Sequence, residues 1–279
     1  MNATIRKHAV LCLASAIFAS SFAFAVRAQD ASPWQSDVHS AVRLLAGSRS
    51  GAVLLGGIAV QLQPGWKTYW RTPGDSGVPP RFDFSKSDNV EAVTVLWPAP
   101  LKFDDGAGGH SLGYHDTVVL PLRIVLKSAD KPVTLRADIG YAVCAKLCIP
   151  VEANAELAFT SVASTEDSAL FAALETVPKP ANVGDPNPLT IRAVKREGAS
   201  EVTVDVVAPD AREVSLFVEG PTPDWALPVP TPVEQSPPGV KRFSFKLDGL
   251  PPGAKPDGAA LKLTLVGPEK AYEFNVNLN

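Results

Sequence analysis

The stretch that decides the fold reads Val133-Thr-Leu-Arg-Ala-Asp-Ile-Gly-Tyr-Ala-Val-Cys-Ala-Lys-Leu-Cys-Ile-Pro-Val-Glu-Ala-Asn-Ala-Glu-Leu-Ala-Phe159. Apolar residues alternate with period two on both sides of Cys144 and Cys148, which is typical of half-buried β-strands. A continuous strand would hold the two cysteines about 13 Å apart, whereas a disulfide needs a Cα separation of roughly 4.4–6.8 Å. If the cysteines pair, the chain must turn between them. We therefore predict a hairpin with strands over 133–142 and 151–160 and the cysteines at its tip.

The same alternation recurs along the chain and predicts an all-β fold. In the first half it covers 38–44, 53–60, 66–70, 90–96 and 118–126. It returns at 189–193, 202–206, 214–218, 243–247, 261–265 and 274–278. Short strands at this spacing, in a chain with 26 prolines and 20 glycines, are typical of immunoglobulin-like β-sandwiches. The sequence therefore predicts two such sandwiches.

A short helix and a proline-rich connector separate the two predicted sandwiches. Thr165-Glu-Asp-Ser168 supplies a capping residue and early acids, and apolar residues then recur at helical spacing, which predicts a helix near 165–176. The prolines that follow predict a stiff connector. The expected domains are 29–162, a helix and connector at 163–188, and 189–279. The last contains neither Cys nor His, so we expect it to be structural or to bind a partner.

The amino terminus has the features of a signal peptide over residues 1–28. A basic start precedes an apolar, small-residue-rich run over 9–25, and Val26-Arg-Ala28 offers a small-x-small cleavage site. Cleavage would remove Cys12 and leave the two cysteines of the hairpin as the only thiols. No later segment approaches the roughly 18 apolar residues of a membrane span. We therefore expect an exported, periplasmic protein with no membrane span after signal removal.

The charge balance excludes two classes of partner. Residues 1–28 contain three basic residues and no acidic one, so the remaining 251 residues carry 23 Lys and Arg against 29 Asp and Glu. Their net charge of −6 would repel polyanions. We therefore expect neither nucleic acid nor an anionic lipid surface as a partner.

The residues around the cysteine pair leave three roles open. A bridge across so short a loop removes little chain entropy, worth about 2 kcal/mol, and at a turn it is accessible to thiolates, which favours redox exchange. Lys146, between the cysteines, would favour a thiolate. The second role is a purely structural bridge. The third is a copper or zinc site in which His110 and His115 join the thiolates of Cys144 and Cys148.

Several motifs in order along the chain resemble one protein family. They are Gly65-Trp-Lys-Thr-Tyr-Trp-Arg-Thr-Pro-Gly-Asp-Ser-Gly77, Trp97-Pro-Ala-Pro100, Lys102-Phe-Asp-Asp-Gly106, Gly113-Tyr-His-Asp116, Leu120-Pro-Leu-Arg-Ile124 and the cysteine segment that ends with Cys148-Ile-Pro150. This ordered set resembles the amino-terminal domain of the thiol:disulfide interchange protein DsbD. It is most similar to the branch found in membrane reductases associated with suppression of copper sensitivity. The helix, the connector and the second β-domain also resemble the soluble part of that branch.

The resemblance implies an immunoglobulin-like domain whose cysteine pair takes part in electron transfer. The pair would receive electrons from a membrane-embedded thiol reductase and pass them to exported thioredoxin-like or disulfide-bearing client proteins. No bound cofactor is implied, because the pair itself carries two electrons. The cysteine spacing is shorter than in the enterobacterial form of the family. The membrane and thioredoxin-like domains of full-length members have no counterpart in this sequence, so the electrons are expected to come from another polypeptide.

The resemblance also implies roles for individual side chains. Phe103 matches the aromatic residue that shields the pair until a partner displaces it, with Asp104 and Asp105 beside it. By the same resemblance Cys148 matches the thiol that attacks clients, although the sequence itself does not decide between the two cysteines. The aromatic surroundings of the pair are matched by Tyr69, Trp70 and Tyr114. From the residues alone, Tyr69 and Trp70 are expected to be ordinary core or sheet-surface aromatics, and Tyr114 is expected to pack where a strand begins.

These observations together predict thiol–disulfide interchange in the periplasm through Cys144 and Cys148. The alternative function is a non-catalytic copper- or zinc-binding or assembly module whose disulfide is static.

Overall fold

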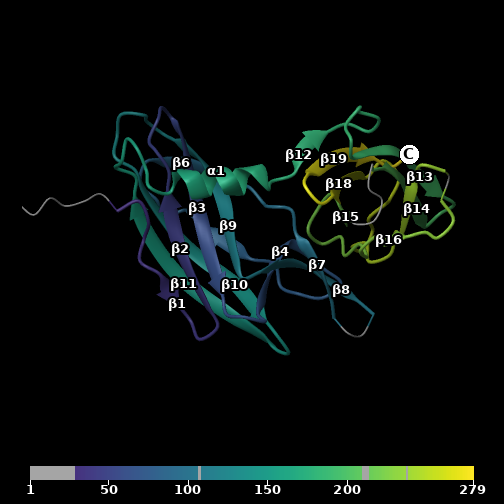
Figure 1. Ribbon diagram of the computed structural model, residues 1–279, viewed down its shortest axis with the longest axis horizontal. Coiled ribbons are helices and arrows are strands. Elements are labelled where there is room, and N and C mark those ends of the chain that lie inside the picture. The colour runs from purple at the N-terminus through teal and green to yellow at the C-terminus, as the bar shows by residue number, and fades with distance from the viewer. Residues whose placement is uncertain (1–28, 106–107, 209–213, 237) are drawn as a thin grey trace, which may run out of the picture.

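The protein consists of two β-sandwiches that lie side by side, with one helix over the first of them (Figure 1). The computed structural model describes residues 29–105, 108–208, 214–236 and 238–279. The predicted signal peptide at 1–28 lies outside the described residues. None of the described segments forms a helix with the length and hydrophobicity that a membrane span requires. The predicted all-β class is confirmed.

The first sandwich contains a five-stranded and a six-stranded sheet. In spatial order, the five-stranded sheet consists of β1 (Gln35–Ser36), β2 (Ser40–Ala46), β3 (Val53–Leu62), β9 (Thr117–Leu126) and β6 (Val90–Val95). The six-stranded sheet, called the β10 sheet below, consists of β11 (Cys148–Ala158), β10 (Thr134–Cys144), β4 (Lys67–Gly74), β8 (His110–His115) and β7 (Leu101–Asp104), with β5 (Arg81–Asp83) also paired to β10. Strand β11 is therefore an edge strand, which suits Pro150 because an edge position requires no ladder hydrogen bond from it.

Alternation along β10 separates the core face of its sheet from the outer face. Leu135, Ala137, Ile139, Tyr141 and Val143 all lie in the buried core between the two sheets. Successive side chains of a strand point to opposite faces, so the even-numbered residues up to the strand's last residue point outward. The end of β10 therefore places its cysteine on the outer face of the sandwich.

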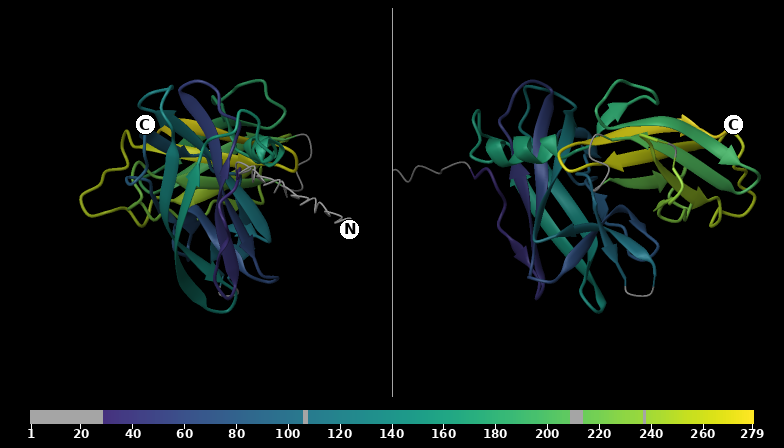
Figure 2. Two further views of the ribbon diagram at one scale, coloured as in Figure 1. Left: turned by 90° about the vertical axis from the view of Figure 1, so that its left-hand side faces the viewer. Right: turned by 45° about the vertical axis from the view of Figure 1, so that its right-hand side comes forward.

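The predicted helix is observed as α1 (Asp167–Glu175) and packs on the first sandwich. Leu170 is fully buried against Leu45 and Ala59 of the five-stranded sheet. The carboxylate of Asp167 accepts the backbone N–H of Ser48 at 2.8 Å. Figure 2 shows the helix along the first sandwich, with the chain continuing from its end into the second. Helix α1 therefore belongs structurally to the first sandwich.

The segment expected to be a connector contributes a strand to the second sandwich. Strand β12 (Lys179–Ala181) pairs in parallel with β19 (Ala271–Asn277) at the edge of a sheet. Proline is tolerated at a sheet edge, where its missing N–H faces no partner strand. Proline spacing alone suggested a linker here, because the pairing partner lies about 90 residues further along the chain.

The second sandwich contains two four-stranded sheets. One consists of β12, β19, β18 (Ala260–Val266) and β15 (Ser215–Glu219). The other consists of β13 (Thr190–Glu197), β14 (Glu201–Val207), β17 (Lys241–Lys246) and β16 (Thr231–Pro232). Its core is a separate cluster of buried apolar residues. One of its aromatic side chains, Phe217, packs instead with the core residues of the first sandwich.

Four strands of the first sandwich, β1, β5, β7 and β8, were not among the predicted strands. The first three have only two to four residues each. Strand β8 reads His-Ser-Leu-Gly-Tyr-His, with a glycine in its interior, and such a run gives a weak alternation signal. These strands carry two of the aromatic residues that the sequence singled out.

Candidate functional site

The two cysteines form a disulfide at the tip of the β10–β11 hairpin. Cys144 ends β10, Cys148 begins β11, and the two face each other on the last rung of the ladder with a Cα separation of 4.2 Å. Only Ala145, Lys146 and Leu147 lie between them. The predicted hairpin with the cysteines at its tip is confirmed.

The two half-cystines differ in their exposure to solvent. Cys144 is 2% exposed, because β10 is an interior strand and β4 lies alongside it. Cys148 is exposed, because it begins the edge strand. Leu147, just before it, is 77% exposed. A thiolate from outside the chain therefore has a route to the Cys148 side of the disulfide, and the buried Cys144 side offers none.

Tyr69 on strand β4 places its hydroxyl group against both sulfur atoms. The hydroxyl donates to Sγ of Cys144 at 2.8 Å and lies 3.1 Å from Sγ of Cys148. Tyr69 is 3% exposed and packs with Ala142 and Cys144 as a small cluster on the outer face of the β10 sheet. Burial raises the pKa of Tyr69 above its usual value near 10. The phenol therefore keeps its proton at neutral pH and remains a hydrogen-bond donor.

A glycine-containing loop covers the ring of Tyr69. Gly77 has a φ of +148°, a conformation that favours glycine, and a Cβ atom placed on it would lie 2.5 Å from Cε1 of Tyr69. The loop is tied to strand β8, because the carboxylate of Asp75 accepts the backbone N–H of His110 at 2.8 Å. The Gly74-Asp-Ser-Gly77 turn of the sequence thus holds the tyrosine in place as well as reversing the chain.

Lys67 lies directly opposite Cys144 in the ladder between β4 and β10. Its ammonium group donates to Oγ of Ser111 at 2.7 Å and lies 5.1 Å from the centre of the Phe103 ring. Lys67 lies within one of the family-like motifs, but the sequence alone pointed to Lys146, which is exposed in the turn, as the positive charge near the cysteines. The missing information was the strand register, because cross-strand neighbours cannot be read from sequence spacing.

Phe103 and the two aspartates beside it lie at the far edge of the same sheet. Phe103 is on strand β7 and its ring packs edge-on to the ring of His115, with centroids 6.1 Å apart. Its partners Lys67 and His115 lie opposite each other on β4 and β8, and Lys67 in turn lies opposite Cys144 on β10. Asp104 lies 2.8 Å from Nδ1 of His110, and Asp105 accepts the backbone N–H of Gly109. The structure brings Phe103 to Lys67, one strand away from Cys144.

Trp70 and Tyr114 face the interior, away from the disulfide. Both lie in the core cluster between the two sheets of the first sandwich. The Tyr114 hydroxyl donates to the backbone carbonyl of Pro98 at 2.8 Å, and burial raises its pKa well above 10. Of the three aromatic residues matched to the surroundings of the pair, the structure brings only Tyr69 to the sulfurs.

The four residues of the predicted alternative metal site are spread over three strands. His115 lies on β8, separated from Cys144 by β4, and its Nδ1 is 2.5 Å from Asp116. His110 lies at the other end of β8. Within 29–105, 108–208, 214–236 and 238–279, no group of three or more His, Cys, Asp or Glu side chains is placed to hold a metal ion. The cysteine thiols are joined to each other in the disulfide.

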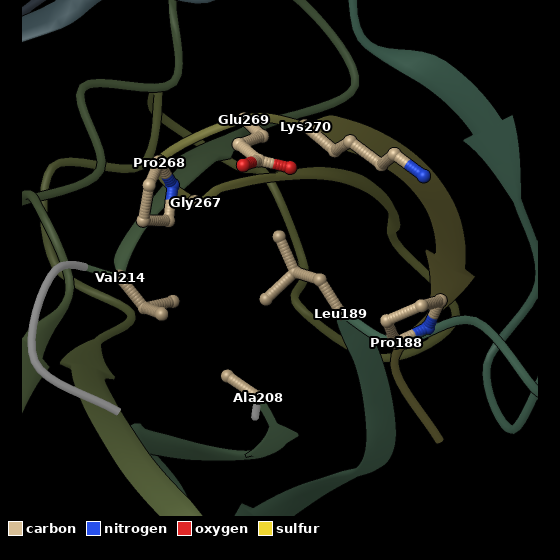
Figure 3. A pocket seen from close by; sticks show the side chains of 8 residues that line it. All are labelled: Pro188, Leu189, Ala208, Val214, Gly267, Pro268, Glu269 and Lys270. Atoms are coloured by element: carbon tan, nitrogen blue, oxygen red, sulfur yellow. The ribbon is translucent and has the colours of Figure 1, made fainter. Parts of the chain in front are cut away.

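The second sandwich has a pocket of about 270 Å³ that contains no redox group (Figure 3). Its lining is mostly apolar, with Glu269 and Lys270 at one side; the apolar side chains are Pro188, Leu189, Ala208, Val214 and Pro268. This sandwich holds no cysteine or histidine. The disulfide at the hairpin tip of the first sandwich is therefore the candidate site.

Comparisons with solved structures agree with this two-sandwich architecture. The crystal structure of the N-terminal periplasmic domain of ScsB from Proteus mirabilis aligns with a TM-score of 0.70 and 23% identity, over 90% of this chain and 98% of that one. At this identity the likeness shows the fold. A conserved domain protein from Bacillus anthracis (TM-score 0.24, 12% identity, 84% of this chain and 75% of that chain) and a protein from Porphyromonas gingivalis W83 (0.21, 11%, 85% and 99%) are far less similar.

Comparison with protein families identifies the sandwich that carries the disulfide. No curated protein matches the chain. Residues 38–160 match the family described as thiol:disulfide interchange protein DsbD, N-terminal. This range runs from just before β2 to just after β11 and so includes both cysteines and Tyr69. The predicted resemblance is confirmed: the cysteine-bearing sandwich of this chain matches the family of DsbD N-terminal domains over residues 38–160.

Proposed function

We propose that this chain carries out thiol–disulfide interchange in the periplasm through the Cys144–Cys148 pair. It accepts two electrons from a membrane-embedded thiol reductase and passes them to exported client proteins that are thioredoxin-like or carry a disulfide. The asymmetric exposure of the disulfide carries the proposal: the exposed Cys148 side is open to a partner, while Cys144 is held buried beneath the Tyr69 hydroxyl.

The reduced pair acts on a client disulfide in two exchanges. The thiolate of Cys148 attacks one client sulfur, a mixed disulfide forms, and the other client sulfur leaves as a thiolate that takes up a proton. Cys144 then attacks Sγ of Cys148, which reforms the internal disulfide and releases the second client thiol. The client gains two electrons and two protons, and this chain loses the same number.

Reduction of the Cys144–Cys148 disulfide by the membrane reductase uses the same exchange reactions in reverse. A thiolate of the membrane reductase attacks Sγ of Cys148 and displaces Cys144 as the leaving thiolate. The hydroxyl of Tyr69, 2.8 Å from Sγ of Cys144, stands where it donates to that leaving thiolate. A second donor thiolate then releases Cys148, and the donor becomes the disulfide.

Two observations support the partners and the compartment. The family of residues 38–160 is that of a thiol:disulfide interchange protein, and the similar ScsB structure is described as a periplasmic domain. An exported client would meet the pair at the hairpin tip, where the turn residues and Cys148 are exposed. Phe103 would shield the approach from the side of Lys67 until a partner docks.

Trapping of mixed disulfides tests the proposal. The Cys144→Ser variant keeps the attacking thiol and lacks the resolving one, so it should accumulate mixed disulfides with donor and client in the exporting cell. These are detected after acid quenching and alkylation as bands that disappear on reduction. Cys148→Ser should trap far less, because its remaining thiol is buried, and the double variant is the control for unrelated thiols.

A measurement of the reduction potential completes the test. An exchange pair should titrate above about −300 mV, whereas a static structural bridge lies below that value. The function is refuted if neither single-cysteine variant traps a partner and the potential falls in the structural range.

A further inference from the structure

Three consecutive residues of strand β4 reach three different parts of the molecule. Tyr69 contacts the sulfurs of the pair, Trp70 lies in the core, and Arg71 reaches the second sandwich. Strand β4 therefore connects the disulfide to the second sandwich through a hydrogen bond from Tyr69 at one end and ion pairs of Arg71 at the other. The sequence left the role of that sandwich open. Figure 1 shows β4 running from the first sandwich toward the strands of the second.

The part of β4 that follows Tyr69 is only weakly held by its own sheet. Strand β10 pairs with β4 only at Lys67 and Thr68. Strand β8 pairs with it from Lys67 to Tyr69, and the register then shifts until Gly74. The path of the segment just after Tyr69 is therefore set by contacts outside the sheet.

The second sandwich supplies those contacts. Arg71 donates from Nε to Oε1 of Glu219 at 2.9 Å and from Nη2 to Oε2 at 2.7 Å, a bidentate pair, and Nη2 also reaches Glu273 at 2.6 Å. The Thr72 hydroxyl donates to Glu219 at 2.9 Å. The ring centroids of Trp70 and Phe217 lie 6.1 Å apart, and Phe217 is on β15, the same strand as Glu219.

The ion pairs of Arg71 attach strand β4 to the second sandwich, and they are strengthened by their charge and partial burial. Burial alone would lower the pKa of Arg71, but hydrogen bonds and charge from Glu219 and Glu273 outweigh it and raise the pKa, so Arg71 stays charged. The guanidinium group also stacks 4.6 Å from the centre of the Trp70 ring. Planar bidentate pairing fixes orientation as well as distance.

We propose that Arg71 is a positioning residue for the redox pair. Through Glu219 and Glu273, the second sandwich holds strand β4 so that the Tyr69 hydroxyl stays within hydrogen-bond distance of both sulfurs. The inference rests on the proposed function, because it gives the second sandwich a part in setting the redox equilibrium of that same site. A phenol donates more strongly to a thiolate than to a disulfide sulfur, so a well-placed Tyr69 favours the reduced pair.

A double-mutant cycle tests the proposal on the full exported chain. The thiol–disulfide equilibrium constant is measured in dithiothreitol buffers for wild type, Tyr69→Phe, Arg71→Met and the double variant. Tyr69→Phe should shift the equilibrium toward the disulfide by about three- to tenfold, or roughly 15–30 mV. Arg71→Met should shift it at least about twofold in the same direction and have no further effect on the Tyr69→Phe background.

The chain provides a closely matched control for loss of a bidentate ion pair. Arg242 donates from Nε and Nη2 to the two carboxylate oxygens of Asp205 inside the second sandwich. The side chains of this pair are 25% and 13% exposed, against 22% and 14% for Arg71 and Glu219. Arg242→Met should therefore weaken the fold by a similar amount and leave the redox equilibrium unchanged. Glu219→Gln serves as the milder variant if Arg71→Met does not fold.

The outcomes separate this proposal from the proposed function. The positioning role is overturned if Arg71→Met and Glu219→Gln leave the equilibrium unchanged, or if their shift persists in full with Phe at position 69. It is also overturned if Arg242→Met shifts the equilibrium equally, since loss of stability alone would then explain the result. Dithiothreitol reduces even a static bridge, so this equilibrium can be measured whether or not the pair trapped any cellular partner.

Discussion

Two side chains of strand β4 act on the cysteine pair in different ways. Tyr69 offers a neutral donor to both sulfurs, whereas Lys67 is a cationic residue directly opposite Cys144 in the strand ladder. Residues directly opposite each other in an antiparallel pair have Cβ atoms about 5 Å apart. The Lys67 ammonium donates to Ser111 on β8, so its charge would act on a Cys144 thiolate from the neighbouring strand, and a nearby cation favours a thiolate over a thiol. Lys67 should therefore make Cys144 a better leaving group when a donor attacks Cys148.

Replacing Lys67 with Met should slow the thiolate chemistry of the reduced pair. The loss of a partly screened charge pair amounts to about 1 kcal/mol, or roughly a fivefold change. The measurement is the rate of Cys144 alkylation by iodoacetamide at pH 7 in the Cys148→Ser background. This small neutral reagent needs far less room at the buried thiol than a protein thiolate does, and its rate reports the thiolate fraction and access.

The matched control for that experiment is Lys146→Met. Lys146 is exposed in the hairpin turn, where water and salt screen its charge, so its loss should change the rate less than about twofold. If Lys146→Met slows alkylation more than Lys67→Met does, the effective cation lies in the turn and the assignment to Lys67 is wrong.

At the scale of elements, the position of each strand in its sheet explains the asymmetry of the disulfide. Cys144 ends an interior strand and is covered by β4, whereas Cys148 starts the edge strand β11. The loop that follows β4 adds a second constraint, because Gly77 packs against the Tyr69 ring. Together, these elements leave Cys148 exposed to solvent and keep Cys144 buried.

The Gly77→Ala variant should lose stability and displace Tyr69. At φ +148° an alanine is strained, and its Cβ would overlap the Tyr69 ring, so we expect a loss of about 2–4 kcal/mol in urea unfolding. The redox equilibrium should also shift in the direction of Tyr69→Phe.

Gly51→Ala is the control for backbone strain without a clash. Gly51 has a φ of +65°, and its added Cβ would meet no atom within 4 Å, so only about 1–2 kcal/mol should be lost. Its redox equilibrium should equal that of wild type. Equal losses of stability in the two variants would show that contact with Tyr69 is unimportant.

At the scale of the whole molecule, the first sandwich buries phenol groups around its core and its redox pair. Burial is the largest cause of the raised pKa of Tyr69, Tyr114 and Tyr141. The charge of Arg71 partly opposes this rise at Tyr114, and the hydrogen bond with Ser40 partly opposes it at Tyr141. The unfolded chain loses these protons near pH 10, while the folded chain retains them to higher pH. Stability from this source is therefore complete below about pH 10 and is lost as the pH rises through the folded pKa values.

Urea unfolding between pH 8 and pH 11 measures this loss. The midpoint should change little up to about pH 9.5 and then fall steeply. Tyr141→Phe removes one of the three phenols and should flatten the fall, while lysine titration affects both proteins equally. A midpoint that stays level to pH 11, or an unaltered slope in the variant, would contradict the predicted linkage.

The sequence by itself determined the strands with strong alternation, the helix, the hairpin and the placement of the cysteines at its tip. These follow from local periodicity and from the geometric limits of a disulfide, both of which act over a few residues. The motifs around the cysteines also identified the family of the first sandwich. The short strands β5 and β7 and the polar strand β8 lacked such a local signal.

Only the tertiary structure decided which side chains meet the pair. The register of β4 placed Tyr69 and Lys67 on the same face of the sheet as the cysteines and Trp70 on the opposite face, and a shift of one residue would have reversed all three. The attachment of Arg71 to Glu219 joins residues 148 positions apart. Local periodicity carries no information on contacts at that separation, because they depend on how two complete sandwiches pack against each other.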